Sequence, residues 1–161
     1  MIPTLATQRL TLRAATMADW PAYCDFYASE ASAPAGGPRD ARTTWAFFAS
    51  DVGHWTLHGF GWFTLDDGTG AVGTCGLHHP PHQPEVEIGW NTYARAQRKG
   101  YAVEAARAVL AWGRGRVAGR IVSYIDRANA PSQAVARKLG ATTDGTPKAP
   151  GSRSEVWVHP A

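Results

Sequence analysis

Apolar and polar residues alternate with two different periods along the chain, and the change of period separates expected helices from expected strands. The alternation at 9–13 predicts a short half-buried strand. An aromatic stripe at helical spacing over 16–27 predicts a helix, and the pair Thr16 and Asp19 has the spacing of a capping box at its start. A proline- and glycine-rich loop follows, and a second helix is expected from about 40 to 50.

From residue 55 the pattern becomes that of strands. Segments 60–65 and 71–77 flank a turn at 66–70 and have the pattern of a hairpin, and the next strand is expected at 86–90. The remaining expected elements are a helix at 100–112, a buried strand at 121–125, a helix from Asn129 to Gly140, and a weak strand pair around 142–146 and 155–159. This order predicts a single α/β domain over residues 1–161, with a mixed sheet of about six to seven strands and helices on both faces.

The composition favours a folded domain with a small-molecule pocket. The 161 residues are 44% apolar and 18% charged, and seven of them are tryptophan. The formal net charge is +3, but the basic residues are scattered, and only Arg95, Arg98 and Lys99 lie close together. A local anion site is therefore expected, and a nucleic-acid partner is not.

Cysteine use and the lengths of the apolar runs indicate the compartment. Cys24 and Cys75 are too few for a disulfide framework, and the chain does not open with a basic segment followed by an apolar run. No apolar stretch approaches the length that spans a bilayer. We therefore expect a reduced, cytoplasmic protein without a membrane partner.

Segment 97–102 is the strongest chemical signal, because it joins an expected strand to an alanine-rich helix. It consists of Gln97, Arg98, Lys99, Gly100, Tyr101 and Ala102. Gly100 lets the backbone approach a ligand closely, and the first amides of the helix have no partner within it. These amides, with Arg98 and Lys99, suit a phosphate or pyrophosphate. An ordinary strand-to-helix turn with solvated basic residues has the same spacing.

Two motifs carry a resemblance to a known family. Gln-x-x-Gly-x-Ala at 97–102 resembles the pyrophosphate-binding motif of the Gcn5-related N-acetyltransferases (GNAT). The block at 129–140, which begins Asn-Ala-Pro-Ser and ends Lys-Leu-Gly, is similar to the block that this family carries after the next strand. Segments 7–13 and 87–90 further resemble the branch that contains ribosomal-protein N-terminal acetyltransferases. The resemblance covers almost the whole chain, and the paired motifs are specific at their mutual spacing.

The resemblance implies a strongly twisted mixed sheet with two parallel strands, here 86–92 and 121–126, that splay apart to admit the pantetheine arm of acetyl-coenzyme A. It implies that the protein uses this cosubstrate to acetylate a primary amine, on a protein N-terminus or a small molecule, as a monomer or homodimer. The implied coenzyme-binding residues are Trp90, Asn91 and Thr92 near the thioester, Gln97, Arg98, Lys99, Gly100, Tyr101 and Ala102 at the pyrophosphate, Asn129 at the pantetheine amides, and Ser132. Asn129 also has the position of a helix cap, and both roles can hold at once.

Transfer to an amine requires an unprotonated nitrogen, and Glu87 is the candidate base. It alternates with Val86 and Ile88, so if those two side chains face the core it faces the acceptor side. A solvent-facing strand glutamate has the same pattern, and Glu85 lies on the same pleat face and could substitute for it.

The residue that protonates the leaving thiolate is less well defined. The family often has a tyrosine four residues after the position of Ser132, and this chain has Ala136 there. Ser132, Tyr124 or solvent remain as proton donors. An acyl-coenzyme A-binding module with weak or no turnover is the alternative function. The loops at 33–42 and 54–61 are expected to wall the acceptor pocket, because variable connections carry specificity.

Two further patterns carry no functional expectation. His78, His79 and His82, with Cys75 nearby, have no standard zinc spacing, and we expect no metal. Segment 113–118 matches a dinucleotide fingerprint, but it follows a helix and precedes a strand, which is the reverse of the required context.

Overall fold

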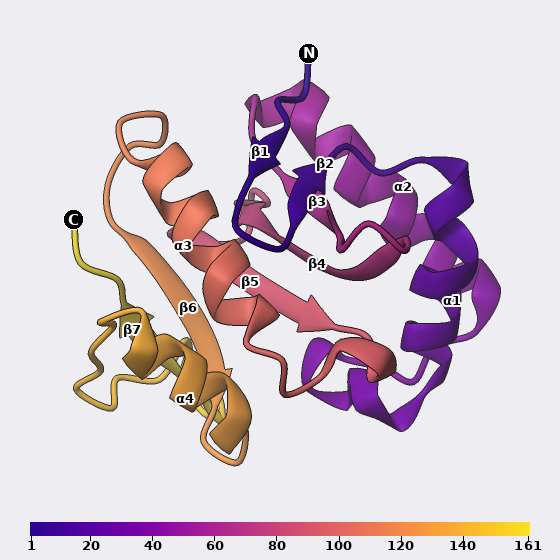
Figure 1. Ribbon diagram of the computed structural model, residues 1–161. Helices are drawn as coiled ribbons and strands as arrows, with labels where there is room; N and C mark the ends of the chain where they lie inside the picture. The colour runs from indigo at the N-terminus through magenta and orange to yellow at the C-terminus, as the bar shows by residue number, and fades with distance from the viewer.

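Seven strands form one mixed sheet whose spatial order follows the chain order, as the computed structural model of residues 1–161 shows (Figure 1). The strands are β1 (Leu5–Ala6), β2 (Thr11–Arg13), β3 (Trp62–Asp66), β4 (Ala71–His78), β5 (Val86–Thr92), β6 (Ile121–Asp126) and β7 (Ser154–Val158). Neighbouring strands are antiparallel except β5 and β6, which run parallel. The expected mixed sheet of six to seven strands is confirmed.

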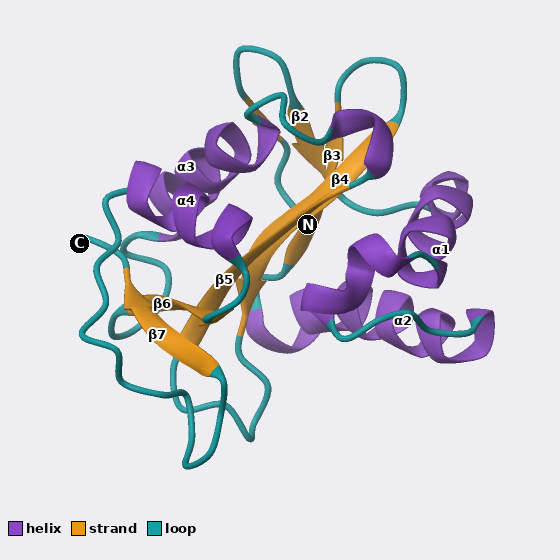
Figure 2. Cartoon of the chain, turned by 90° about the horizontal axis from the view of Figure 1, so that it is seen from below, coloured by secondary structure: helices purple, strands orange, loops and turns teal.

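Four α-helices cover both faces of this sheet, as expected (Figure 2). The helices α1 (Trp20–Ala28) and α2 (Ala41–His58) lie on one face, and α3 (Tyr101–Gly113) and α4 (Ala130–Lys138) lie on the other. Three short 3-10 turns complete the elements: η1 (Met17–Asp19), η2 (Glu30–Ala35) and η3 (Ala94–Ala96). None of the helices combines the length and the apolar character that crossing a membrane requires.

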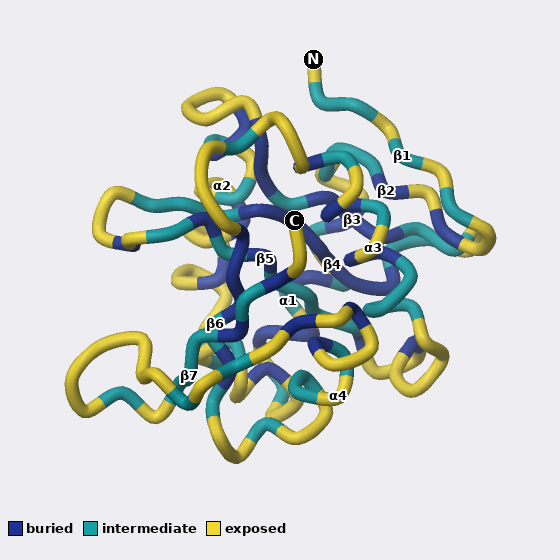
Figure 3. The backbone as a smooth tube through the Cα atoms, turned by 90° about the vertical axis from the view of Figure 1, so that its left-hand side faces the viewer, coloured by how far each residue is buried: buried dark blue, intermediate teal, exposed yellow.

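The main core lies between the sheet and α3, and Figure 3 shows the buried backbone of β4, β5 and β6 around it. Phe63, Leu77 and Ile88 come from three neighbouring strands and are fully buried. Ala105 and Ala106 on α3 are also fully buried, and such small side chains let a helix approach a sheet closely. Each large apolar side chain buried here contributes about 1.5–3 kcal/mol. This layer holds β4 and β5 in place beneath the site described below.

The helix α2 is longer than the sequence predicts, because it continues past residue 50 to His58. The strand pattern expected from residue 55 is therefore wrong for this last turn. Trp55 is buried on α2, and its indole Nε1 donates a hydrogen bond to the carbonyl of Trp62 at 2.8 Å. The helix ends only at Gly59, which takes a left-handed φ of 73°.

Only the second member of the expected C-terminal strand pair is a full strand. Segment 142–146 contributes no ladder, and Thr142 and Pro147 each form one isolated bridge to β7. Gly145 between them has a left-handed φ of 83°, and Pro147 has no N–H to donate. A continuous strand cannot form across these two residues.

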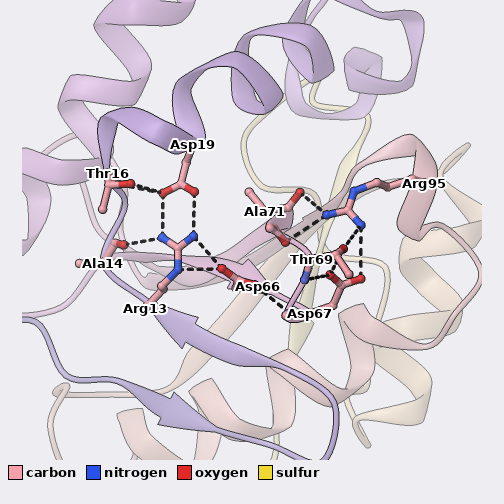
Figure 4. A network of polar contacts seen from close by, with 11 residues as sticks. Arg13, Ala14, Thr16, Asp19, Asp66, Asp67, Thr69, Ala71 and Arg95 are labelled. Atoms are coloured by element: carbon pink, nitrogen blue, oxygen red, sulfur yellow. Dashed lines mark hydrogen bonds and ion pairs between the residues drawn. The ribbon is translucent and has the colours of Figure 1, made fainter.

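Arg13 joins the N-terminal strands to the start of α1 (Figure 4). It donates to both carboxylate oxygens of Asp19 at 2.8 Å each, and to Oδ2 of Asp66 on β3 at 2.8 and 3.0 Å. Asp19 also accepts a hydrogen bond from the backbone N–H of Thr16 at 2.8 Å. The predicted capping box is present, and its carboxylate has an additional role as the partner of an arginine 6 residues earlier in the chain.

Arg95 binds the turn between β3 and β4, as Figure 4 also shows. It donates to the hydroxyl of Thr69 at 2.7 Å and to two backbone carbonyls of the turn at 3.1 and 3.2 Å. The sequence grouped Arg95 with Arg98 and Lys99 as one basic cluster, and the structure corrects this. Only Arg98 and Lys99 belong to the loop that precedes α3.

We expect Asp19→Ala to lower the free energy of unfolding by about 2 kcal/mol at pH 7, because it leaves part of the Arg13 guanidinium buried without its partner. The loss should depend on pH. Burial alone would raise the pKa of Asp19, but the hydrogen bonds and charge of Arg13 and the contacts of Thr16 lower it overall. Such a carboxyl stabilises the fold above its unfolded-state pKa of about 4, and the stabilisation is lost as pH falls through the folded-state value.

Denaturant unfolding at steps from pH 7 to pH 3 measures this effect. The wild-type curve should approach that of Asp19→Ala at the acid end, and Asp25→Ala, an exposed aspartate on α1, should follow the wild type throughout. A constant gap between wild type and Asp19→Ala at every pH would show that the carboxylate charge does not contribute.

Candidate active site

The strands β5 and β6 pair only at their first residues and then diverge (Figure 1). The last register pair is Glu87 with Val122. One residue further on, the hydroxyl of Ser123 donates to the carbonyl of Ile88 at 2.8 Å and closes the base of the divergence. The backbone of β5 at 89–92 therefore has no strand partner on this side. The splay implied by the family resemblance is present at the expected pair of strands.

A groove of about 990 Å³ crosses this divergence, from α1 and α2 over β5 and β6 to the start of α4. The residues expected from the sequence that line it are Glu87, Trp90, Asn91, Tyr124, Asn129 and Ser132. Thr92 and segment 97–102 do not line it. The structure thus brings the candidate base and both candidate acids to one groove, and it places the expected phosphate loop beyond the end of β5, after η3.

Segment 97–102 forms the turn that opens α3. Arg98 and Gly100 both have left-handed backbone, with φ of 62° and 83°. Gly100 occupies the position before the helix, and no side chain caps its first turn. The first amides of α3 are therefore available to an anion, and the side chains of Arg98 and Lys99 are exposed beside them.

Arg9 contacts the turn before α3 in three ways. Its guanidinium donates to the carbonyl of Lys99 at 2.9 Å, forms an ion pair with Glu104 at 2.6 Å, and lies over the ring of Tyr101 at 4.8 Å. The sequence gave no signal for this contact, because Arg9 is 90 residues away from Lys99. A diphosphate group fits the unpaired first amides of α3, the left-handed Gly100 and the exposed cations Arg98 and Lys99.

Asn129 caps α4, which is one of the two roles expected for it from the sequence. Its side-chain Oδ1 accepts a hydrogen bond from the backbone N–H of Ser132 at 3.2 Å. The side-chain amide of Asn129 has no acceptor in the protein and lines the groove. The cap therefore leaves its N–H groups free for a ligand.

Glu87 lies on the groove side of β5, opposite the buried Val86 and Ile88 in the pleat. Its Oε2 accepts a hydrogen bond from the side chain of Gln83 at 3.0 Å. Burial raises the pKa of Glu87, and the charge of Lys148 and the hydrogen bond from Gln83 oppose part of this rise. A carboxylate with a raised pKa is a stronger proton acceptor, which is what an ammonium substrate requires.

Glu85 is not equivalent to Glu87. Its carboxylate is held by the guanidinium of Arg120 through two hydrogen bonds, and it does not line the groove. The structure therefore separates two glutamates that the sequence placed on one pleat face.

The two candidate acids differ in access. Ser132 lines the groove at the first turn of α4. The ring of Tyr124 also lines the groove, but its hydroxyl is shielded from solvent and has no hydrogen-bond partner, with the ammonium of Lys148 4.2 Å from the ring centre. Burial, and the nearby charges of Glu85 and Glu87, raise the pKa of Tyr124. Ser132 is therefore the more accessible proton donor.

Ala136 occupies the position at which the resemblance places a tyrosine. It is fully buried and packs with Ile125, Ala141 and Trp157. Apolar packing thus fills the space around this position, and Ala136 does not line the groove.

The residues that line the groove from the side of α1 and α2 were only partly expected. Segment 33–42 lines it, as predicted, through Ala33, Pro34, Ala35 and Arg39. Segment 54–61, which forms the last turn of α2 and the residues after it, does not line the groove. Phe47 and Asp51 from α2, and Trp62 from β3, line the groove instead. A Cβ atom at Gly89 would collide with the Trp62 ring, so glycine at this position leaves room for the end of the indole against β5.

His54, near the end of α2, has a structural role. Nδ1 of His54 donates to the carbonyl of Phe60 at 2.7 Å, and its Nε2 accepts from the backbone N–H of His79 at 3.0 Å. Both ring nitrogens of His54 are therefore used within the protein. No group of three or more His, Cys, Asp or Glu side chains is arranged to hold a metal ion.

Comparison with known proteins places the chain in a family. The model of the acetyltransferase (GNAT) domain matches residues 9–142. The crystal structure of an acetyltransferase from Agrobacterium tumefaciens is 38% identical, with a TM-score of 0.92 over 100% of this chain and 96% of that one. The chain belongs to the GNAT acetyltransferase family.

The chain is also similar to two further proteins, one over part of its length and one in fold. An uncharacterised N-acetyltransferase of Bacillus subtilis, YjdG, is 38% identical over 69 residues, which are 42% of this chain and 41% of that protein. The matches span less than half the length of the curated relatives. RimJ of Mycobacterium smegmatis in complex with a coenzyme A disulfide is 19% identical, with a TM-score of 0.70 over 98% of this chain and 85% of that one, and this likeness shows the fold alone.

Proposed function

We propose that the protein transfers the acetyl group of acetyl-coenzyme A to a primary amine, on a protein N-terminus or on a small molecule. The observation that carries this proposal is the groove of about 990 Å³ in which Glu87 lies beside the divergence of β5 and β6. Family membership supplies acetyl transfer, and the groove supplies a place where an amine meets a base.

Residues at the divergence of β5 and β6 and at the start of α3 support the coenzyme assignments. Acetyl-coenzyme A supplies the acetyl group as a thioester. The unpaired backbone of β5 at 90–92 would hold the thioester end, and Asn129 would bind the pantetheine amides. The free amides of segment 97–102, with the side chains of Arg98 and Lys99, would bind the diphosphate.

Glu87 would prepare the acceptor. An amine is mostly protonated near neutral pH, and only its free form is nucleophilic. Glu87 would accept the ammonium proton directly or through water, and Gln83 holds the carboxylate in place by a hydrogen bond at 3.0 Å. Ser132 would donate a hydrogen bond to the departing sulfur, with water as the other proton source.

A binding module of the same fold, with little turnover, is the second candidate. The observation that favours it is the buried Ala136 at the position where the family often has its proton donor. Steady-state thiol release over a panel of amines separates the two candidates, because a binding module would hold the coenzyme and release no thiol.

Acetyl-coenzyme A at about 100 times its Kd should stabilise the protein by about 2.7 kcal/mol and raise Tm by about 5–10 °C, because it binds only the folded state. Differential scanning fluorimetry measures the shift. Pantetheine, which lacks the nucleotide and its diphosphate, should give a much smaller shift at the same concentration. The absence of any shift at millimolar acetyl-coenzyme A would contradict the donor site.

A further inference from the structure

Asp51 on α2 is a carboxylate in the groove for which the proposed chemistry has no use. It lines the groove from the helical wall, whereas Glu87 lines it from the sheet. The hydroxyl of Tyr23 donates to its Oδ2 at 2.8 Å, and this is the only hydrogen bond that the Asp51 carboxylate makes within the protein. Its other oxygen has no partner, and Asp51 takes part in no ion pair.

The neighbouring cation does not neutralise Asp51. The guanidinium of Arg39 donates to the carbonyls of Ala35 and Gly36 at 2.7 and 3.2 Å, and it lies 3.7 Å from the centre of the Phe47 ring. Arg39 is therefore fixed at the loop that precedes α2. Its charge acts on Asp51 only from a distance and lowers the pKa of that carboxyl slightly against the effect of burial.

The surroundings of Asp51 favour a cation at its free oxygen. Burial raises the pKa of Asp51 to about 7, and the hydrogen bond from Tyr23 and the charge of Arg39 offset only part of the rise. A partly desolvated carboxylate with one hydrogen bond gains strongly from a cation that reaches its free oxygen. Trp62 also lines the groove and is only partly buried, and an aromatic ring attracts an ammonium group.

We infer that Asp51 is a specificity-determining residue that binds a second cationic group of the acceptor, so that the acceptor is a small molecule with two basic nitrogens, such as a diamine. This inference rests on the proposed amine acetylation. One nitrogen of the acceptor lies at Glu87 and is acetylated, and the other remains an ammonium and pairs with Asp51 across the groove.

The test compares each α,ω-diamine of a chain-length series with the monoamine of equal length. The wild type should show kcat/KM about tenfold or more higher for the best diamine than for its monoamine. Asp51→Asn should reduce this ratio by about 10- to 100-fold, which is the range for losing a hydrogen bond to a charged group. Asparagine keeps an oxygen that can accept from Tyr23, so the contact between α1 and α2 survives.

Two further variants separate recognition from structure. Asp25→Asn changes an exposed aspartate on α1 outside the groove and should keep the wild-type ratio. Tyr23→Phe removes the hydrogen bond and leaves the charge, and it should also keep a high ratio even where Tm falls. If Tyr23→Phe lowers the diamine-to-monoamine ratio of kcat/KM as much as Asp51→Asn does, the inference is wrong. Asp51 would then act by holding α1 and α2 together through Tyr23.

The inference and the proposed function fail in different ways. Equal kcat/KM for diamines and monoamines, unchanged in Asp51→Asn, would leave amine acetylation standing and refute the second subsite. If no amine releases thiol, calorimetry of the diamine against the protein saturated with coenzyme A decides the inference. Binding that weakens at least tenfold in Asp51→Asn supports the subsite without turnover, and the absence of such weakening refutes it.

Discussion

Glu87→Gln is expected to lower kcat/KM for the amine acceptor by about 100-fold at neutral pH while the Kd for coenzyme A stays within about twofold of the wild type. The amide has the shape of the carboxylate but cannot take up a proton. Thiol release gives kcat/KM, and calorimetry gives Kd. Because burial raises the pKa of Glu87, kcat/KM of the wild type should fall on the acid side at a pH above the ordinary glutamate value, and the variant should lack this limb.

Glu85→Gln is the matched control for this prediction. Its carboxylate pairs with Arg120 outside the groove, so the variant should keep the wild-type kcat/KM. A slow Glu85→Gln enzyme beside a full-rate Glu87→Gln enzyme would move the base by two residues. If both variants keep the wild-type rate at every pH, carboxylate base catalysis is wrong and the groove acts by positioning an amine that solvent has deprotonated.

The sequence predicted the elements that depend on local pattern. Alternation marked β5, whose residues Val86 and Ile88 are buried on one face and Glu87 lies on the other. Helical spacing marked α3, with Gly100 immediately before it. The end of α2 could not be found in this way, since the aromatic residues around Trp55 suit a strand as well as a helix. The packing of Trp55 and its bond to the Trp62 carbonyl stabilise the helical form.

The site was predictable where a motif is continuous in the chain, and it was not where distant residues meet. Segment 97–102 was singled out by its glycine, its basic residues and the family resemblance, and the structure places it at the start of α3 as predicted. Arg9, which braces this loop, and Asp51, which lines the groove opposite Glu87, come from elements that carry no motif. The separation of Glu85 from Glu87 depends on Arg120, 35 residues further on, and no spacing rule indicates that pair.

Gly100→Val should raise the Kd for coenzyme A by about tenfold or more, the effect expected when hydrogen bonds to a charged group are lost. The left-handed φ of 83° is open to glycine, and a β-branched side chain there forces the backbone to move. A Cβ atom would also meet Nη2 of Arg9 at 3.4 Å, where that side chain braces the loop. Calorimetry with coenzyme A measures the change in Kd.

The loss must be separated from the cost of a strained backbone, and Gly115→Val provides the comparison. Gly115 follows α3 with a φ of 78°, and no atom lies within 4 Å of a Cβ built there. Both valines should lower the free energy of unfolding by about 1–2 kcal/mol, because each puts a side chain in the left-handed region. Only Gly100→Val should weaken coenzyme binding, and only for ligands that contain the diphosphate, so pantetheine should bind both variants alike. Wild-type affinity for coenzyme A in Gly100→Val would mean that the diphosphate binds somewhere other than the first turn of α3.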